Sequence, residues 1–313
     1  MGMTTDDGHS GGSGSGLEPA LLAEHRGRLT GLAYRMLGTV ADAEDAVQET
    51  FARWVRLTGG ERDAIENPAA WFTRVVGRIC LDELGSARAR RESYVGEWLP
   101  EPLPAGAGLF GAAPPPDPLD RVALDESVST ALLVVLEALT PAERVAFVLH
   151  DVFAVPFAEI AEIVGRTPEA CRQLASSARR HVRERRAAEV PRERHDAVVR
   201  AFIAATGSGE LGELLAVLDP GVRLVSDGGG LASAALRPVV GADHVARFIL
   251  GLKQQRGPGL QVAVEETADG LTLAFGEDGA IDAVLTAEVR GDRISAIRIM
   301  RNPEKLRLWN GRT

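Results

Sequence analysis

The chain has 313 residues, 45% of them hydrophobic, and a formal net charge of −9. That length suits two or three domains, and no apolar run approaches the roughly 20 residues that a membrane-spanning helix needs. Residues 1–16 are polar and lack the apolar core of a secretion signal, so we expect a disordered tail and a cytoplasmic protein. Two cysteines, Cys80 and Cys171, are too few for a disulfide framework or metal cluster, and we expect no metal and no cofactor.

The first predicted unit, residues 17–95, is helical. Apolar residues at helical spacing predict a helix over Leu17–Leu37, and a second helix opens at Thr39 with Phe51 and Trp54 in its apolar stripe. The first two turns of that second helix carry the candidate partner-binding side chains Asp42, Glu44, Asp45, Gln48 and Glu49. Acids near a helix N-terminus are favoured by the helix dipole, so a solvated face explains them as well as a partner does.

A polar loop over Thr58–Glu66 precedes a third helix, which we predict from Asn67 to Glu83. The candidate nucleic-acid residues at its start and along it are Asn67, Trp71, Arg74 and Arg78. Aromatic rings beside arginines can hold unpaired bases, although a core position explains Trp71 equally well.

Residues 96–119 read as a linker, because seven prolines between positions 100 and 118 forbid a regular element. Within it, Trp98 and Leu99 are costly to leave in water, so we expect this stretch to dock on another part of the protein.

Residues 120–190 are predicted to form a second helical unit, with helices over Asp120–Leu139 and Pro141–His150 before a helix-turn-helix. Gly165 ends the first helix of that pair, and Thr167 caps the second. The second helix presents outward Pro168, Glu169, Arg172, Gln173, Ser176, Ser177, Arg179, Arg180 and Arg183. Arg and Gln suit base edges in a DNA major groove, while the alternative is an ordinary helical hairpin with a solvated face.

The C-terminal part, residues 195–313, is predicted to be α+β, with short helices and five strands forming a curved antiparallel sheet. Such a sheet often encloses a cavity, into which Asp227, His244, Asp282 and Glu288 could face for proton transfer. The three glycines after Asp227 instead favour an interdomain turn.

Together these stretches resemble the extracytoplasmic-function sigma factors of bacterial RNA polymerase. AYRMLGTVADAEDAVQETFARWVR and NPAAWFTRVVGRICLDELGSARARR are similar to their first domain. LEALTPAERVAFVLHDVFAVPFAEIAEIVGRTPEACRQLASSARRHVR resembles the second. WLPEP at 98–102, DGGG at 227–230 and NPEKL at 302–306 match the subgroup with a fused C-terminal SnoaL-like domain. The resemblance implies a multidomain protein: two all-α sigma domains followed by an α+β NTF2-like (SnoaL-like) cone domain.

The resemblance also implies roles for these surfaces. The acidic helix would bind the clamp helices of the β′ subunit of core RNA polymerase. The loop over Thr58–Glu66 and the helix from Asn67 to Glu83 would capture a flipped base of the promoter −10 element and melt that element. The helix from Pro168 to Arg183 would read the −35 element. Binding through the polymerase would account for an acidic chain that acts on DNA.

In this subgroup the fused domain replaces a separate anti-sigma factor. We therefore expect the linker to dock on the C-terminal domain and hold the sigma domains together. The residues assigned to this interdomain contact are Trp98, Leu99, Pro100, Glu101, Pro102, Asp227, Gly228, Gly229, Gly230, Asn302, Pro303, Glu304, Lys305 and Leu306.

Two other classes of function stay open at this point. One is an NTF2-like enzyme, or a sensor with a small ligand in its C-terminal cavity, fused to a DNA-binding module. The other is a stand-alone helix-turn-helix repressor, which leaves residues 17–95 and the net acidity unexplained.

Overall fold

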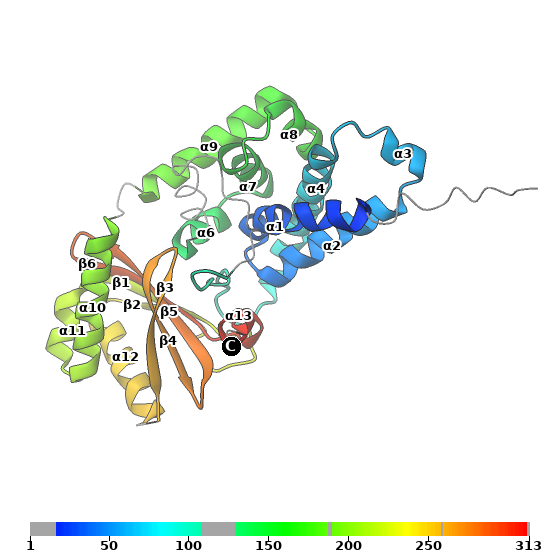
Figure 1. Ribbon diagram of the computed structural model, residues 1–313. Helices are drawn as coiled ribbons and strands as arrows, with labels where there is room; N and C mark the ends of the chain where they lie inside the picture. Colours follow the sequence, from blue (N-terminus) through cyan, green and yellow to red (C-terminus); the bar gives the residue numbers. More distant parts are fainter. Residues whose placement is uncertain (1–16, 108–128, 187–189, 258, 312–313) are drawn as a thin grey trace, which may run out of the picture.

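The computed structural model describes residues 17–107, 129–186, 190–257 and 259–311. The predicted tail, residues 1–16, the stretch 108–119 of the predicted linker and the first part, residues 120–128, of the predicted helix Asp120–Leu139 lie outside the described residues. Figure 1 shows two groups of helices on one side of the molecule and a sheet with its own helices on the other. No helix in the described ranges combines the length and apolarity needed to cross a membrane.

The first helical unit consists of α1 (Leu17–Leu37), α2 (Val40–Arg56), α3 (Gly59–Asp63) and α4 (Pro68–Glu92). Thr39 caps α2 as predicted, because its hydroxyl accepts a bond from the Asp42 amide at 3.2 Å. The predicted loop over Thr58–Glu66 is wrong in part. Thr58 and Glu61 form a reciprocal capping box there and start α3. The third predicted helix also runs past Glu83 to Glu92.

The second helical unit consists of α6 (Thr130–Glu137), α7 (Pro141–Phe147), the π-helical turn η1 (Val148–Val152), α8 (Phe157–Val164) and α9 (Pro168–Arg186). The predicted helix-turn-helix is confirmed: Gly165 ends α8 with φ +70°, and the Thr167 hydroxyl accepts a bond from the Ala170 amide at the start of α9.

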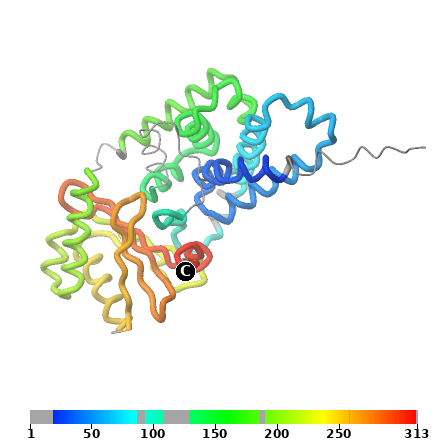
Figure 2. The backbone as a smooth tube through the Cα atoms, viewed as in Figure 1, coloured from blue at the N-terminus to red at the C-terminus, as the bar shows by residue number. Residues whose placement is uncertain are grey.

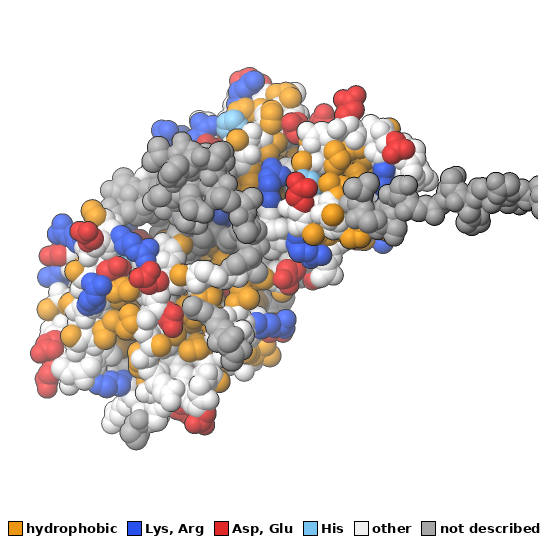
Figure 3. Space-filling view, viewed as in Figure 1, with side chains coloured by type: hydrophobic (Ala, Val, Ile, Leu, Met, Phe, Trp, Pro, Cys, Tyr) orange, Lys and Arg blue, Asp and Glu red, His pale blue; other side chains and the backbone are white. Residues whose placement is uncertain are grey.

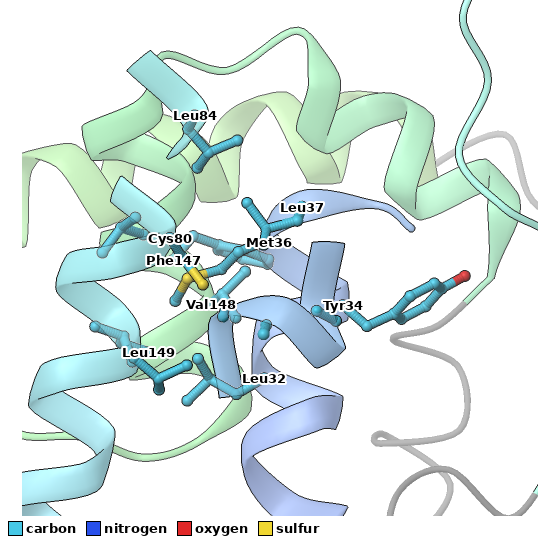
Figure 4. Packing of buried hydrophobic residues seen from close by; sticks show 14 of the residues in the cluster. Leu32, Tyr34, Met36, Leu37, Cys80, Leu84, Phe147, Val148 and Leu149 are labelled. Atoms are coloured by element: carbon cyan, nitrogen blue, oxygen red, sulfur yellow. The ribbon is translucent and has the colours of Figure 1, made fainter. Parts of the chain in front are cut away.

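The two helical units share one hydrophobic core. Figure 4 shows Leu32 and Met36 of α1, Cys80 of α4 and Phe147–Leu149 from the α7–η1 region meeting in it, while Tyr34 points away. The buried Arg144 of α7 also links the two units, because it donates a hydrogen bond to the Met36 carbonyl of α1 at 2.8 Å. Its charge is paired with Glu137 of α6 at 2.6 Å. The packing therefore joins the two units closely.

The C-terminal domain is a six-stranded sheet in the order β2-β1-β6-β5-β4-β3. Its strands are β1 (Leu218–Asp227), β2 (Val239–Val240), β3 (Gln261–Thr267), β4 (Gly270–Glu277), β5 (Ala280–Arg290) and β6 (Arg293–Met300). The prediction of an antiparallel sheet is wrong for one pair, because β1 and β6 run parallel. It also lacked β2, which is only two residues long.

The two faces of this sheet bury different parts of the chain. Helices α10 (Arg192–Ser208), α11 (Leu211–Val217) and α12 (Ala242–Arg256) pack on one face around Leu285 and Ile297. Alternate residues such as Val284 and Met300 face the other side, because side chains along a strand alternate. There they meet Leu99 of the linker and the short C-terminal elements η2 (Pro303–Lys305) and α13 (Arg307–Asn310). This second face lies toward the helical units, as the tube in Figure 2 shows.

Candidate nucleic-acid and interdomain interfaces

The carboxylate of Asp227, at the end of β1, is the centre of the contact between linker and C-terminal domain. Its side chain is fully buried. One oxygen accepts a bond from the Tyr94 hydroxyl at 2.6 Å, and the other accepts bonds from the Leu99 amide at 2.9 Å and the Lys305 ammonium at 2.7 Å. Burial and this carboxylate raise the pKa of Tyr94, so its phenol stays protonated as the donor.

Lys305 completes this interdomain cluster. Its ammonium also donates to the Leu99 carbonyl at 2.7 Å and lies 4.2 Å from the centre of the Trp98 ring. The Asn302 amide donates to the Tyr94 hydroxyl at 3.0 Å. Gly229 has a φ of +59°, and a Cβ there would collide with the Asn302 amide, so glycine is needed at this position. The three short motifs singled out in the sequence therefore meet, while Pro303 and Glu304 of the third motif are exposed.

On its other side, the linker packs against the turn that joins α1 to α2. The Glu101 carboxylate accepts a bond from the Val40 amide at 2.8 Å, and the Glu101 amide donates to the Gly38 carbonyl at 2.8 Å. The Tyr34 hydroxyl donates to the Glu101 carbonyl at 2.5 Å. From the C-terminal side, the Trp309 indole donates to the Pro102 carbonyl at 2.8 Å. Residues 99–102 are consequently buried between the first helical unit and the C-terminal domain.

Burial of Glu101 predicts a specific pH dependence. Desolvation raises its pKa from 4.5 to about 7, despite the opposing bond from the Val40 amide. The folded protein then binds a proton that the unfolded chain has lost. The free energy of unfolding should therefore fall by about 3 kcal/mol as pH rises from about 4.5 through about 7.

Chemical unfolding between pH 5 and pH 8 measures this loss. Glu101→Gln keeps an acceptor for the Val40 amide but cannot ionise. Its free energy of unfolding should therefore not show this fall with pH, and above pH 7 the variant should be more stable than the wild type. Identical pH profiles for the two proteins would contradict the assignment.

The acidic face of α2 lies beside the interdomain cluster, near Tyr94 and Trp98. Asp42, Glu44, Asp45 and Gln48 are exposed, and Glu49 is half-exposed and paired with Arg53 at 2.8 Å. A pocket of about 580 Å³ lies where α2 and α4 meet the linker. Its lining includes Asp42, Asp45, Glu49, Glu83, Tyr94 and Trp98.

The predicted nucleic-acid residues of α4 face the second helical unit. Arg74 pairs with Glu162 of α8 at 2.9 Å, and Arg78 donates to the Ile163 carbonyl at 3.0 Å. Between them Gly77 allows a close approach, because a Cβ there would lie 3.3 Å from the Ile163 side chain. Both arginines are thus engaged by α8.

The remaining two candidates of this helix have local roles. Trp71 is half-buried and makes an edge-on contact with Trp54 at 5.2 Å, as the core interpretation predicts. Asn67 is exposed, and its side chain accepts a bond from the Ala70 amide at the start of α4.

The predicted recognition helix α9 is largely open to solvent. Its exposed candidates are Pro168, Glu169, Arg172, Gln173, Ser176, Arg180 and Arg183. Ser177 and Arg179 are half-buried, and Arg179 pairs with Asp151 of η1 at 2.9 Å. Figure 3 shows basic side chains along α9 and interspersed charges elsewhere on the visible face. Such an exposed basic face on a helix can contact DNA phosphates and bases.

The set of cavity residues expected in the C-terminal domain is not assembled. Asp227 is enclosed by the donors Tyr94, Leu99 and Lys305 rather than open to a cavity. His244 is exposed and contacts the Val240 carbonyl. Asp282 pairs with Arg256 and Glu288 with Arg298, each at 2.6 Å. Each of the four has a different partner, so the interdomain-turn interpretation of Asp227 is the one that the geometry supports.

Family models match both helical units: Sigma-70 region 2 matches residues 21–90, and Sigma-70 region 4 matches residues 129–182. The chain is 45% identical to the ECF RNA polymerase sigma factor SigJ of Mycobacterium tuberculosis, over 91% of this chain and 88% of the relative. The chain belongs to the ECF RNA polymerase sigma factors. It is also 40% identical to the probable ECF sigma factor SigI of the same organism, over 90% of this chain and 92% of the relative.

The crystal structure of M. tuberculosis SigJ has a similar fold. The match has a TM-score of 0.69 at 40% identity and covers 93% of this chain and 98% of that chain. The predicted architecture is confirmed: two helical sigma regions are followed by an α+β domain. ECF sigma factors are initiation factors and not enzymes, so the enzyme alternative is wrong. Regions 2 and 4 imply binding to core RNA polymerase and promoter DNA.

Several residues that build the interfaces of this sigma factor were not identified from its sequence. Tyr94 lies just before the linker and Trp309 near the C-terminus, and both are aromatic residues outside any periodic pattern. Glu162 looked like an ordinary surface acid of α8. Within the described ranges, no group of three or more His, Cys, Asp or Glu side chains could hold a metal ion.

Proposed function

We propose that this sigma factor is held in a closed form by its C-terminal domain and that core polymerase binds the acidic face of α2. Asp42, Glu44 and Asp45 are exposed at the start of that helix, where they can pair with a basic surface. Following the resemblance, the partner surface is formed by the clamp helices of the β′ subunit. Such a factor works in the cytoplasm, where polymerase and promoters are.

In the proposed complex α4 recognises the −10 element and α9 the −35 element. The closed form opposes the first of these roles, because Arg74 pairs with Glu162 and Arg78 donates to the Ile163 carbonyl of α8. Opening of the contact between α4 and α8 would release both arginines for phosphates or bases.

Control by the fused domain is supported above all by the fully buried Asp227 carboxylate. A single side chain of the C-terminal domain binds Leu99 of the linker and Tyr94 just before it. The same linker is seated on α1 and α2 through Glu101. A domain that holds the linker in this way restrains the separation of the two sigma regions without a separate anti-sigma protein.

Charge reversal on α2 tests the polymerase-binding surface. Asp45→Arg should weaken binding to core polymerase by at least tenfold, because a basic partner surface would meet a like charge. The affinity is measured with labelled full-length protein and purified core enzyme. Asp292→Arg is the matched control, since Asp292 is also an exposed aspartate but lies in the β5–β6 turn. Equal affinities for the two variants would contradict the proposed surface.

A further inference from the structure

The turn between β3 and β4 reaches across to the second helical unit. One oxygen of Asp269 accepts a bond from the Thr130 amide at 2.8 Å, and the other accepts one from the Ala131 amide at 2.9 Å. Thr130 and Ala131 are the first two residues of α6, whose amides have no partner within the helix. The helix's own cap, Ser129, bonds the next amide, that of Leu132, at 3.1 Å. The C-terminal domain thus supplies part of the N-terminal cap of a helix in sigma region 4.

The capping carboxylate is held in place from its own domain. The Asp196 carboxylate of α10 accepts a bond from the Leu271 amide at 2.9 Å. A side chain on Gly270 would run into the ring of His195, so the turn lies directly on that buried histidine. The Asp269 amide itself donates to the Thr267 hydroxyl at 3.2 Å. These contacts fix the position of the β3–β4 turn, so that Asp269 points toward α6.

Apolar packing and a second backbone bond surround the same contact. Val134 of α6 packs against the second face of the sheet, on the cluster that includes Ala274 and Val284. The Ala105 amide of the linker donates to the Glu266 carbonyl of β3 at 2.9 Å. The hydrogen bonds of Asp269 go to α6, whereas those of Asp227 go to Tyr94, Leu99 and Lys305, and both contacts border the same apolar cluster of the sheet.

We propose that the β3–β4 turn is a second latch, which holds sigma region 4 through the cap on α6 and must release before α9 can move away from the C-terminal domain. The inference rests on the proposed closed form. In this arrangement Asp227 holds the linker and Asp269 holds region 4, so the C-terminal domain contacts the sigma regions at two places. A carboxylate at a helix N-terminus also complements the helix dipole, which makes this contact stronger than one between neutral groups.

The test uses the full chain with Asp269→Ala. Hydrogen exchange of the peptide that starts α6 reports the cap itself. Electron-spin distance measurements between labels at Glu184→Cys on α9 and Asp292→Cys on the β5–β6 turn report separation of region 4 from the C-terminal domain. The native Cys80 and Cys171 are fully buried and stay unlabelled. Asp278→Ala is the matched control, because Asp278 occupies the neighbouring β4–β5 turn and is exposed.

We expect exchange at the start of α6 and the population of longer distances each to rise about fivefold in Asp269→Ala, as for the loss of a helix cap, and to stay unchanged in Asp278→Ala. Asp269→Asn retains one acceptor oxygen, so exchange and the population of longer distances should rise less than in Asp269→Ala. This graded result would distinguish loss of the cap from misfolding. Faster exchange without longer distances would overturn the latch, because the cap would then be local. No change in either measurement would overturn it as well.

Asp227→Asn in the same labelled protein separates this inference from the proposed function. If Asp227→Asn lengthens the distances and Asp269→Ala does not, only the second latch is wrong. If neither variant changes them, the closed form itself is wrong.

Discussion

Asp227→Asn is expected to lower the free energy of unfolding by about 3–5 kcal/mol, because it removes the carboxylate that pairs with the buried Lys305 ammonium at 2.7 Å. The asparagine amide would also face groups that are themselves donors, including the Leu99 amide. Denaturant unfolding followed by tryptophan fluorescence measures the loss, and Trp98 lies within the affected cluster.

Asp243→Asn is the control for this experiment. Asp243 pairs with Arg247 on the exposed side of α12 at 2.8 Å, and an exposed pair of this kind contributes little. A loss in Asp227→Asn no larger than that of the control would contradict the interdomain cluster.

A double-mutant cycle measures the interaction between Asp227 and Lys305 separately from the destabilisation that each single substitution causes. Lys305→Met alone leaves the carboxylate buried without its cation, whereas the double variant with Asp227→Asn leaves neither charge behind. The double variant should therefore cost clearly less than the sum of the single variants. Strict additivity would show that the two groups are not coupled in solution.

Gly77→Leu is expected to separate α4 from α8 and to increase binding of single-stranded −10 DNA. Even a Cβ at this position would be 3.3 Å from Ile163, so a leucine side chain overfills the contact, at a cost of about 1–3 kcal/mol. The separation releases Arg74 and Arg78, and fluorescence anisotropy with a labelled single strand measures the gain in affinity.

Gly85→Leu is a closely matched control, because Gly85 lies on the same helix and a Cβ there meets nothing within 4 Å. Both substitutions replace glycine in α4 and gain the same helix propensity, so their difference isolates the contact with α8. Equal DNA affinity in the two variants would contradict the occlusion of the −10 surface.

The local features of this fold could be predicted from sequence, because they depend on neighbouring residues. Thr167 and Gly165 mark the ends of α9 and α8 through cap and turn chemistry, and both predictions are confirmed. The capping box of α3 was also visible as Thr58 and Glu61, but the glycines between them favoured a loop. The parallel pairing of β1 with β6 could not be predicted, since alternation gives neither a strand's partner nor its direction.

The interfaces were predictable only where a motif identified them. The three short motifs indicated that the linker meets the C-terminal domain, and their residues do lie together around Asp227. Nothing local to Arg74 indicates Glu162 as its partner, and nothing local to Asp269 indicates α6. Both contacts join residues more than 80 positions apart, and they depend on how the units pack rather than on periodicity.

The central claim is that the free protein is closed and that polymerase opens it. The most direct measurement is single-molecule energy transfer between dyes at Ser86→Cys on α4 and Glu184→Cys on α9, without and with core polymerase. We predict one high-transfer population for the free protein, which shifts to low transfer when core enzyme binds, and a partial shift already in free Asp227→Asn. The same low transfer in free and bound protein, or high transfer that persists in the active complex, would contradict the account.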